Sequence, residues 1–237
     1  MVNLSLIGCR KCRSLPPLQQ LPKLRELYIE GMHEVQHLGD GLPFPSLEML
    51  KFEDMPAWKE WSFSISIGVE ESRSQFPCLR ELSLRGCPNL ITVSPLRLPS
   101  LQKLYLEECE EVVLKSIVGV TSLTSLEVVD IRGLSQLEEA LVQSLVALES
   151  LVFEKCNQLM ALWQNGGEVA QKNNLVRLQR LRVASCPQLV SFGEELHDEG
   201  LPCINLQELY IRDCENFVCF PKAGVPHMLR LCHHLKH

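Results

Sequence analysis

The sequence predicts an α/β-type solenoid: short parallel strands stack into one curved sheet, while turns, loops and a few helical segments return the chain behind it. Three observations predict this fold. One twelve-residue pattern recurs along the chain, its central residues alternate between apolar and polar, and further apolar residues follow three and six places beyond it. A unit this short cannot bury its own apolar edge, so successive units have to stack and share one core.

The repeated pattern is L-x-x-L-x-x-L-x-L-x-x-C, with Met or Leu replacing the Cys in some copies. A shortened copy, MVNLSLIGC, opens the chain, and eight further copies align without gaps from Leu21, Phe44, Phe76, Leu98, Leu123, Leu145, Leu175 and Cys203. Alternate residues of the central L-x-L point to opposite faces of a strand. We therefore expect a single solenoid over residues 1–237, with about nine short strands on its concave side, a truncated N-terminal repeat and a partial repeat at residues 226–237.

The residues beyond the twelfth position predict the return side of each coil. Trp58 and Trp61 fall at its buried positions and are expected to be structural anchors. After Leu134, apolar residues recur at helical spacing, which predicts one helical return segment.

Composition narrows the class of protein. With 46% hydrophobic and 22% charged residues, the chain is typical of a globular protein, and its net charge of −6 does not favour nucleic acid. No apolar run is long enough for a membrane span, and no signal peptide opens the chain. Eleven cysteines cannot all pair within one chain, so we expect reduced thiols and a cytoplasmic location. Six of them occupy the twelfth position, where a thiol serves as a small apolar side chain: Cys9, Cys87, Cys109, Cys156, Cys186 and Cys214.

With these residues in hand, the chain resembles the leucine-rich-repeat region of plant coiled-coil nucleotide-binding disease resistance proteins. The resemblance rests on CRSLPPLQQLPKLRELYIEGM, on FPSLEMLKFEDMPAWKEW and on the recurrent C-P-x-L of Cys87 and Cys186. It implies a fragment of an intracellular immune receptor that senses pathogen effectors or a guarded host protein. The receptor's own nucleotide-binding module is a further implied partner. No P-loop motif occurs here, so no cofactor is expected on this chain. ADP or ATP is expected only if a nucleotide-binding module lies upstream.

The exposed residues of the strands are the candidate binding surface. Tyr28, Tyr105 and Tyr210 are all the tyrosines of the chain, and each is placed at the middle exposed position of its strand. Tyr and Arg are frequent anchors of protein interfaces, although strands also favour Tyr for packing, and Glu/Lys pairs keep a sheet soluble. The predicted protein-binding residues on the concave face are Glu26, Tyr28, Glu30, Lys51, Glu53, Glu81, Arg85, Lys103, Tyr105, Glu107, Asp130, Arg132, Glu154, Arg180, Arg182, Glu208, Tyr210 and Arg212.

Three short motifs suggest metal or redox chemistry when they are read alone. Residues 33–37 read HEVQH, a zinc-peptidase motif, but that chemistry needs a helix, and Gly31 and Gly39 leave too few residues for one. Val35 falls at a buried repeat position instead. Residues 9–12 read CRKC, two ordinary repeat positions, and residues 232–237 read CHHLKH, a terminal cluster without a partner pair. We therefore expect no metal site, no catalytic residues and no enzyme.

Two other functions stay open from the sequence. The repeats could recruit substrates for a ubiquitin ligase, whose adaptors carry an F-box that this chain lacks. The chain could also be a non-functional receptor fragment.

Overall fold

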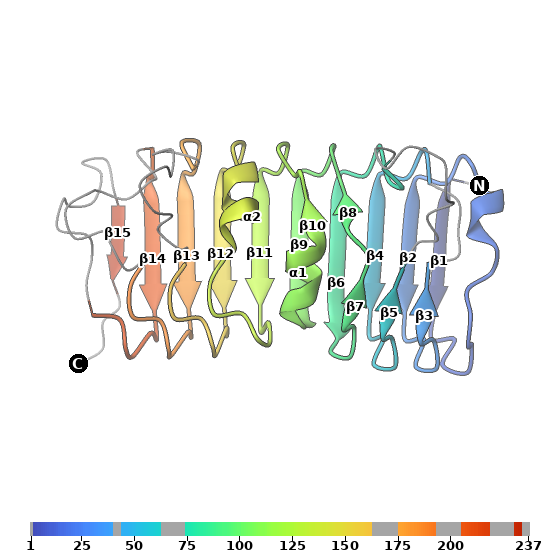
Figure 1. The fold of residues 1–237 in the computed structure, drawn as a ribbon, viewed down its shortest axis with the longest axis horizontal. Helices are drawn as coiled ribbons and strands as arrows, with labels where there is room; N and C mark the ends of the chain where they lie inside the picture. The colour runs from blue at the N-terminus through green and yellow to red at the C-terminus, as the bar shows by residue number, and fades with distance from the viewer. Residues whose placement is uncertain are drawn as a thin grey trace. The chain divides into compact units, whose positions relative to one another are not determined.

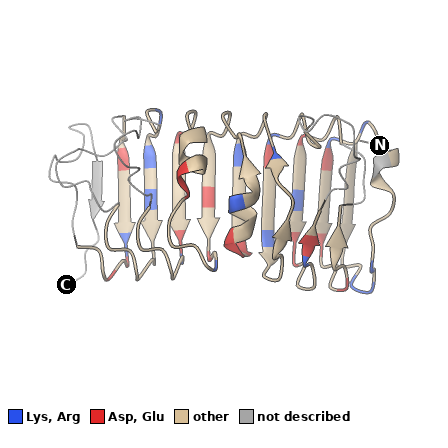
Figure 2. Ribbon diagram, in the orientation of Figure 1, with Lys and Arg blue, Asp and Glu red and all other residues tan. Residues whose placement is uncertain are grey.

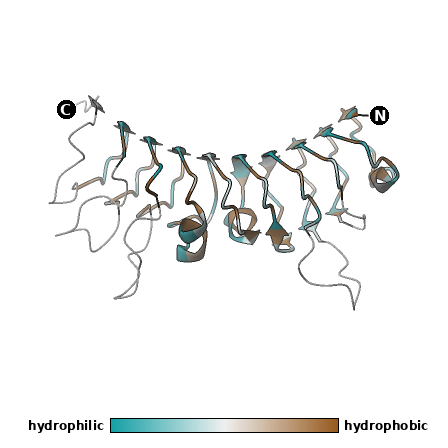
Figure 3. Ribbon diagram, turned by 90° about the horizontal axis from the view of Figure 1, so that it is seen from above, coloured by the Kyte–Doolittle hydropathy of each residue, from teal (hydrophilic) through white to brown (hydrophobic). Residues whose placement is uncertain are grey.

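The computed structural model describes residues 2–39, 44–62, 74–162, 175–192, 205–218 and 230–233. The chain forms two compact units, Met1–Val120 and Thr121–His237, and five parallel strands are described in the main sheet of each. Within each unit the strands form one layer, and the helices and return segments lie on a single side of it (Figure 1, Figure 3). This is the strand-and-return architecture of an α/β leucine-rich-repeat solenoid, as predicted.

The main sheet of the first unit has one strand in each repeat. Its strands pair in chain order and are β1 (Asn3–Ile7), β2 (Glu26–Glu30), β4 (Met49–Glu53), β6 (Glu81–Cys87) and β9 (Lys103–Cys109). Every pair is parallel, and residues at equal repeat positions face one another, such as Tyr28 and Lys51. The strands predicted at the first five repeats are therefore confirmed.

Short elements form the return side of the first unit. A second parallel sheet joins β3 (His37–Leu38), β5 (Glu60–Trp61) and β7 (Thr92–Val93), and a two-stranded sheet joins β8 (Leu96–Arg97) to β10 (Ile117–Val118). The 3₁₀ helix η1 (Leu18–Gln20) and the helix α1 (Glu111–Ser116) complete it. The sequence did not locate α1, whose Val113 and Leu114 are buried while Lys115 is exposed and pairs with Glu111 at 2.9 Å.

The second unit follows the same plan. Its sheet joins β11 (Ser125–Val129), β12 (Ser150–Glu154), β13 (Arg180–Ala184), β14 (Glu208–Arg212) and β15 (Arg230–His233), all parallel. The predicted helical return segment is confirmed as α2 (Glu139–Ser144). Farther along, a parallel bridge joins Ala161 to Ser191 on the return side.

Leucine ladders form the core behind each sheet. In the first unit Leu27, Leu50, Leu82 and Leu104 are consecutive neighbours across the strands, and each is at most 3% exposed. Leu126, Leu151, Leu181 and Leu209 form the matching ladder of the second unit. Fully burying one such side chain contributes about 1.5–3 kcal/mol to folding, so these ladders hold the coils together.

Trp58 and Trp61 anchor the return side of the first unit, as predicted. They are 0% and 3% exposed, and their ring centroids lie 4.8 and 5.7 Å from that of Phe52. The Trp58 indole N–H donates to the carbonyl oxygen of Glu60 at 2.8 Å, so its one polar group is satisfied.

A sharp corner lies at or near the end of each main-sheet strand from β1 to β14. The eleventh residue of the pattern, called the corner residue below, takes a positive φ wherever it is described. These residues and their φ angles are Gly8 (70°), Gly31 (66°), Asp54 (53°), Gly86 (63°), Glu108 (52°), Asp130 (49°), Lys155 (56°), Ser185 (53°) and Asp213 (52°). Only three of them are glycines, although this backbone region is costly for other residues. The corner is therefore imposed by its surroundings more than by local preference.

In four described repeats with Cys at position twelve, one carbonyl group at the strand end accepts two hydrogen bonds: those of Arg85, Glu154, Ala184 and Arg212. The corner N–H donates to the carbonyl of the tenth residue in the following repeat, for example Lys155 to Ala184 at 3.0 Å and Ser185 to Arg212 at 2.8 Å. The thiol at position twelve donates to the same kind of carbonyl in its own repeat, as Cys186 does to Ala184 at 3.4 Å. The carbonyl of Ala184 therefore accepts both a backbone N–H and an S–H.

The cysteines at position twelve are free thiols, as expected for a structural role. Cys87, Cys109, Cys156 and Cys186 are buried, while Cys9 and Cys214 are half-buried. Hydrogen bonding with Cys109 and burial raise the pKa of Cys87, and Cys156, Cys214 and burial do the same for the pKa of Cys186. Both thiols therefore stay protonated at neutral pH and can donate to the carbonyl groups of Arg85 and Ala184.

The repeat predicted to start at Leu123 starts three residues earlier, so that prediction was wrong. β11 pairs with β12 so that Leu126 faces Leu151 and Val128 faces Phe153. The pattern therefore begins at Val120 and places Ile131 at position twelve. Both frames fit the sequence because Leu123 and Leu126 are spaced like positions one and four. The register of the neighbouring strand decides between them.

The corner geometry predicts that Lys155→Gly stabilises the protein by about 0.5–1 kcal/mol. Removing the side chain relieves about 1–2 kcal/mol of backbone strain at a left-handed residue. The greater conformational freedom of glycine in the unfolded chain offsets part of this gain. The urea midpoint measures the change. Lys51→Gly is the matched control, because Lys51 lies inside β4 and its loss should lower the midpoint. A drop in both variants would contradict this account of the corner.

Candidate functional site

One face of the strands, called the strand face below, consists of the first, third and fifth residues of each five-residue strand pattern. In the main-sheet strands from β1 to β14, these residues are exposed or half-buried, except for the buried Val129 and Ala184. In β2 the burial alternates, with Leu27 and Ile29 buried and Glu26, Tyr28 and Glu30 on the other side. Sixteen of the predicted residues lie on this face: Glu26, Tyr28, Glu30, Lys51, Glu53, Glu81, Arg85, Lys103, Tyr105, Glu107, Glu154, Arg180, Arg182, Glu208, Tyr210 and Arg212. Acidic and basic residues are interspersed along it in both units (Figure 2).

The predictions for Asp130 and Arg132 were wrong. Both rest on the frame that starts at Leu123, and in the true frame Asp130 is a corner residue with φ 49°. Arg132 lies two residues farther along, beyond the end of β11. The residue that faces Val152 on the strand face is Glu127, which the sequence reading missed. The signal that would have found it is the Val120, Leu123, Leu126, Val128, Ile131 spacing.

Tyr28 joins two carboxylates of neighbouring strands in the first unit. Its hydroxyl lies 2.5 Å from Glu30 Oε2 and 2.9 Å from Glu53 Oε2. A phenol has one hydrogen to donate, so the two acceptors share it. The hydrogen bond to Glu30, partial burial and the bond to Glu53 together raise the pKa of Tyr28 well above its usual value. Tyr28 therefore acts on this face as a fixed hydrogen-bond donor.

Arg85 continues this network across the next two strands. Its Nε lies 2.8 Å from Glu107 Oε2, and its Nη1 lies 3.4 Å from Glu53 Oε1. The Tyr105 hydroxyl donates to Glu107 Oε2 at 2.6 Å. Exposed ion pairs add about 0–1 kcal/mol each to stability, so their main effect is to hold these side chains in defined positions.

Tyr210 lies between two arginines in the second unit. The guanidinium carbon of Arg182 is 4.9 Å from the Tyr210 ring centroid, within cation–π range. A hydrogen bond with Tyr210, followed by the charge of Asp213, raises the pKa of Arg212. Arg182 also approaches Glu154, with 4.0 Å between Nη2 and Oε2. Tyr210 thus has one arginine over its ring and a hydrogen bond to another, and Tyr and Arg are frequent anchors of protein interfaces.

The HEVQH residues form a turn and the start of a strand, as expected. Val35 is fully buried, and His37 belongs to β3. The two histidines have separate acidic partners: His33 Nε2 lies 2.7 Å from Asp54 Oδ2, and His37 Nδ1 lies 3.1 Å from Glu60 Oε2. Each histidine of the motif therefore contacts a different carboxylate.

Within the described ranges, no group of three or more His, Cys, Asp or Glu side chains is arranged to hold a metal ion. Cys12 of the CRKC motif is exposed, and Cys9 donates to the carbonyl of Ile7 at 3.8 Å. The histidines at positions 234 and 237 lie outside the described residues. In that same described part, no helix is both long and apolar enough to cross a membrane.

In-register parallel strands, with leucine ladders on one face and varied polar side chains on the other, define a leucine-rich-repeat protein. No protein-family model matches the chain. The disease resistance RPP13-like protein 1 of Arabidopsis thaliana is 30% identical over an alignment of 239 positions, which covers 94% of this chain and 19% of that protein. Disease resistance protein RGA2 of Solanum bulbocastanum is 26% identical over 176 residues, 68% of this chain and 15% of its own length.

The chain is a homologue of plant disease resistance proteins of the nucleotide-binding leucine-rich-repeat class. It spans about one fifth or less of the length of these two relatives. The resemblance inferred from the sequence is thereby confirmed.

The Tyr28 network predicts an unusual titration. In Tyr105→Phe/Tyr210→Phe protein, Tyr28 is the sole tyrosine, and its absorbance should remain that of un-ionised phenol at about pH 11, above the usual pKa of about 10. Because the folded pKa is raised, this contribution to stability is complete below the unfolded pKa and is lost as pH rises through the folded one. Adding Glu30→Gln and Glu53→Gln should lower the pKa of Tyr28 toward the ordinary value of a tyrosine. Half-ionisation near pH 10 without those changes would refute the network.

Proposed function

We propose that the strand face is the protein-recognition surface of an intracellular plant immune receptor. It would contact a pathogen effector, a guarded host protein or the receptor's own nucleotide-binding module. The observation that carries the proposal is that each strand has a buried face and an exposed face. The ladder residues are buried, whereas the alternate positions present Tyr and Arg side chains in ordered networks. Residues on this face can therefore change without disturbing the core.

Two further observations support the proposal. The homologues are disease resistance proteins, so a role in plant defence is the natural function for this chain. All eight cysteines whose state the structure describes are free thiols, which suits a reducing cytoplasm. The ordered side chains also favour binding, because less rotamer freedom is lost when a partner docks.

The proposal predicts that Tyr28→Ala/Tyr105→Ala/Tyr210→Ala abolishes pathogen-triggered defence in leaves that express the gene encoding this chain. Loss of one interface anchor costs about 2 kcal/mol or more, which is roughly a thirtyfold loss of affinity. The readout is pathogen growth in the leaf, with immunoblots to confirm equal protein abundance.

A return-side variant is the matched control. Lys115→Ala/Glu139→Ala/Gln143→Ala changes three side chains of α1 and α2, away from the strand face. It should respond like the wild type. Normal defence in the tyrosine variant, or equal loss in both variants, would contradict the proposed role of the strand face.

A further inference from the structure

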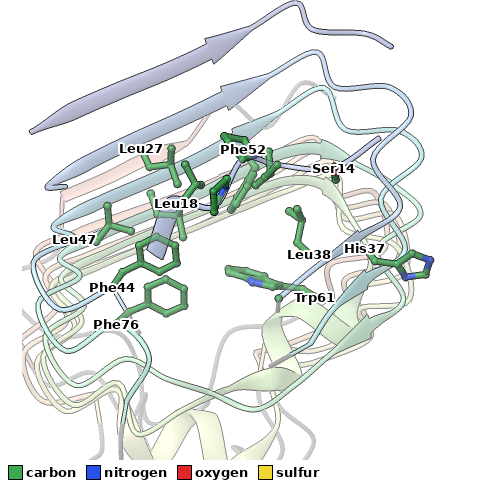
Figure 4. A pocket seen from close by; sticks show the side chains of 15 residues that line it. Ser14, Leu18, Leu27, His37, Leu38, Phe44, Leu47, Phe52, Trp61 and Phe76 are labelled. Carbon is green, nitrogen blue, oxygen red and sulfur yellow. The ribbon is translucent and has the colours of Figure 1, made fainter. Parts of the chain in front are cut away.

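A cavity lies inside the first unit, on the core side of the sheet. Its volume is about 350 Å³. Leu27 on β2 and Leu50 and Phe52 on β4 line its sheet side, while Leu38 on β3 and Trp61 on β5 line it from the return side (Figure 4). The cavity is therefore separate from the strand face, and its role is independent of the function proposed above.

Aromatic rings form one wall of the cavity. The rings of Phe44 and Phe76 are stacked, with centroids 5.7 Å apart and planes only 2° from parallel. The Trp61 ring lies 6.2 Å from Phe76 and 5.7 Å from Phe52, and it points into the same space (Figure 4). Phe44 and Phe76 occupy the first position of their repeats, where the pattern has Leu. In these two repeats, a pair of stacked phenylalanine rings therefore takes the place of two leucines and forms a flat aromatic surface.

The mouth of the cavity is exposed and its interior carries no charge. Ser14, Pro16 and Pro17 are exposed lining residues, so the cavity is reachable from solvent. His37 is the one titratable residue of the lining; its ring points outward and pairs with Glu60 at 3.1 Å (Figure 4). A charged ligand would lose its hydration here and gain no partner inside.

An apolar space of this size is suited to a ligand more than to water. Buried waters need two to four polar partners, and an apolar cavity of about 150 Å³ stays dry and accepts benzene. Small-molecule sites typically measure about 300–1,000 Å³ and are lined mainly by apolar and aromatic side chains. We propose that this cavity is a binding site for a small, uncharged aromatic molecule of one or two fused rings. The ring would lie against Phe44, Phe76 and Trp61.

Calorimetric titration of the full chain with naphthol tests the proposal. Naphthol should bind at one saturable site, and naphthalenesulfonate should bind about tenfold more weakly or worse, because its charge would be desolvated. Leu27→Phe places a ring in the empty space and should abolish naphthol binding. Its melting temperature should stay equal to that of the wild type or rise, because the new atoms fill a void.

A second pair of variants keeps the test decisive if Leu27→Phe fails to fold. Ser14→Trp adds a bulky ring at the exposed mouth and should block binding without touching the core. Ile91→Trp adds the same ring at a side chain that is 63% exposed and outside the lining, and should bind naphthol like the wild type. Absence of saturable binding to the wild type would overturn the proposal, as would equal binding to the Ser14 and Ile91 variants.

Discussion

The repeats depend on hydrogen bonds that link each repeat to the next at the corners, and in four described repeats the accepting carbonyl also binds a thiol. The carbonyl of Ala184 accepts the N–H of Lys155 from the preceding repeat and the thiol of Cys186 from its own. This pair of bonds turns the chain out of the sheet at a fixed residue and ties each coil to its neighbour. A left-handed corner costs about 1–2 kcal/mol for a residue such as Lys155, and the stack supplies the stabilisation that offsets it. With the corners fixed, equal positions face one another and the leucine ladders are complete.

A fixed register explains why the strand face can carry recognition. The ladder side chains pack against their neighbours in adjacent strands, whereas the hydrogen-bond, ion-pair and cation–π partners described for Tyr28, Arg85 and Tyr210 are other residues of the strand face. Changes among these residues alter hydrogen bonds and charge at the surface and leave the buried area unchanged. Plant disease resistance proteins, the homologues of this chain, would gain from such a scaffold, because new partners can be matched without redesign of the core.

Much of this structure can be predicted from the repeat pattern, because the alternation of apolar and polar residues indicates which side chains of a strand are buried. The strands, the buried Trp58 and the turn around Val35 could all be predicted in this way. The frame at Leu123 could not, because two leucine spacings fit equally and only the pairing with β12 separates them. The corners could not be predicted either, because five different residue types adopt the same backbone conformation there, and few of them prefer it. The cavity beside Trp61 depends on side-chain volumes in four repeats, which no local pattern encodes.

The central claim is that ladders and corners, not the strand face, determine the fold. Thermal unfolding followed by circular dichroism tests it most directly on a variant with alanine at Tyr28, Lys51, Arg85, Arg182 and Tyr210. The melting temperature should stay within about 3 °C of the wild type, because each surface substitution usually changes stability by about 0.5 kcal/mol or less and the five changes, of either sign, partly cancel. The single ladder substitution Leu151→Ala should lower it by about 6 °C or more, because a buried Leu→Ala change costs about 2–5 kcal/mol. A face variant that melts as early as Leu151→Ala would contradict the claim.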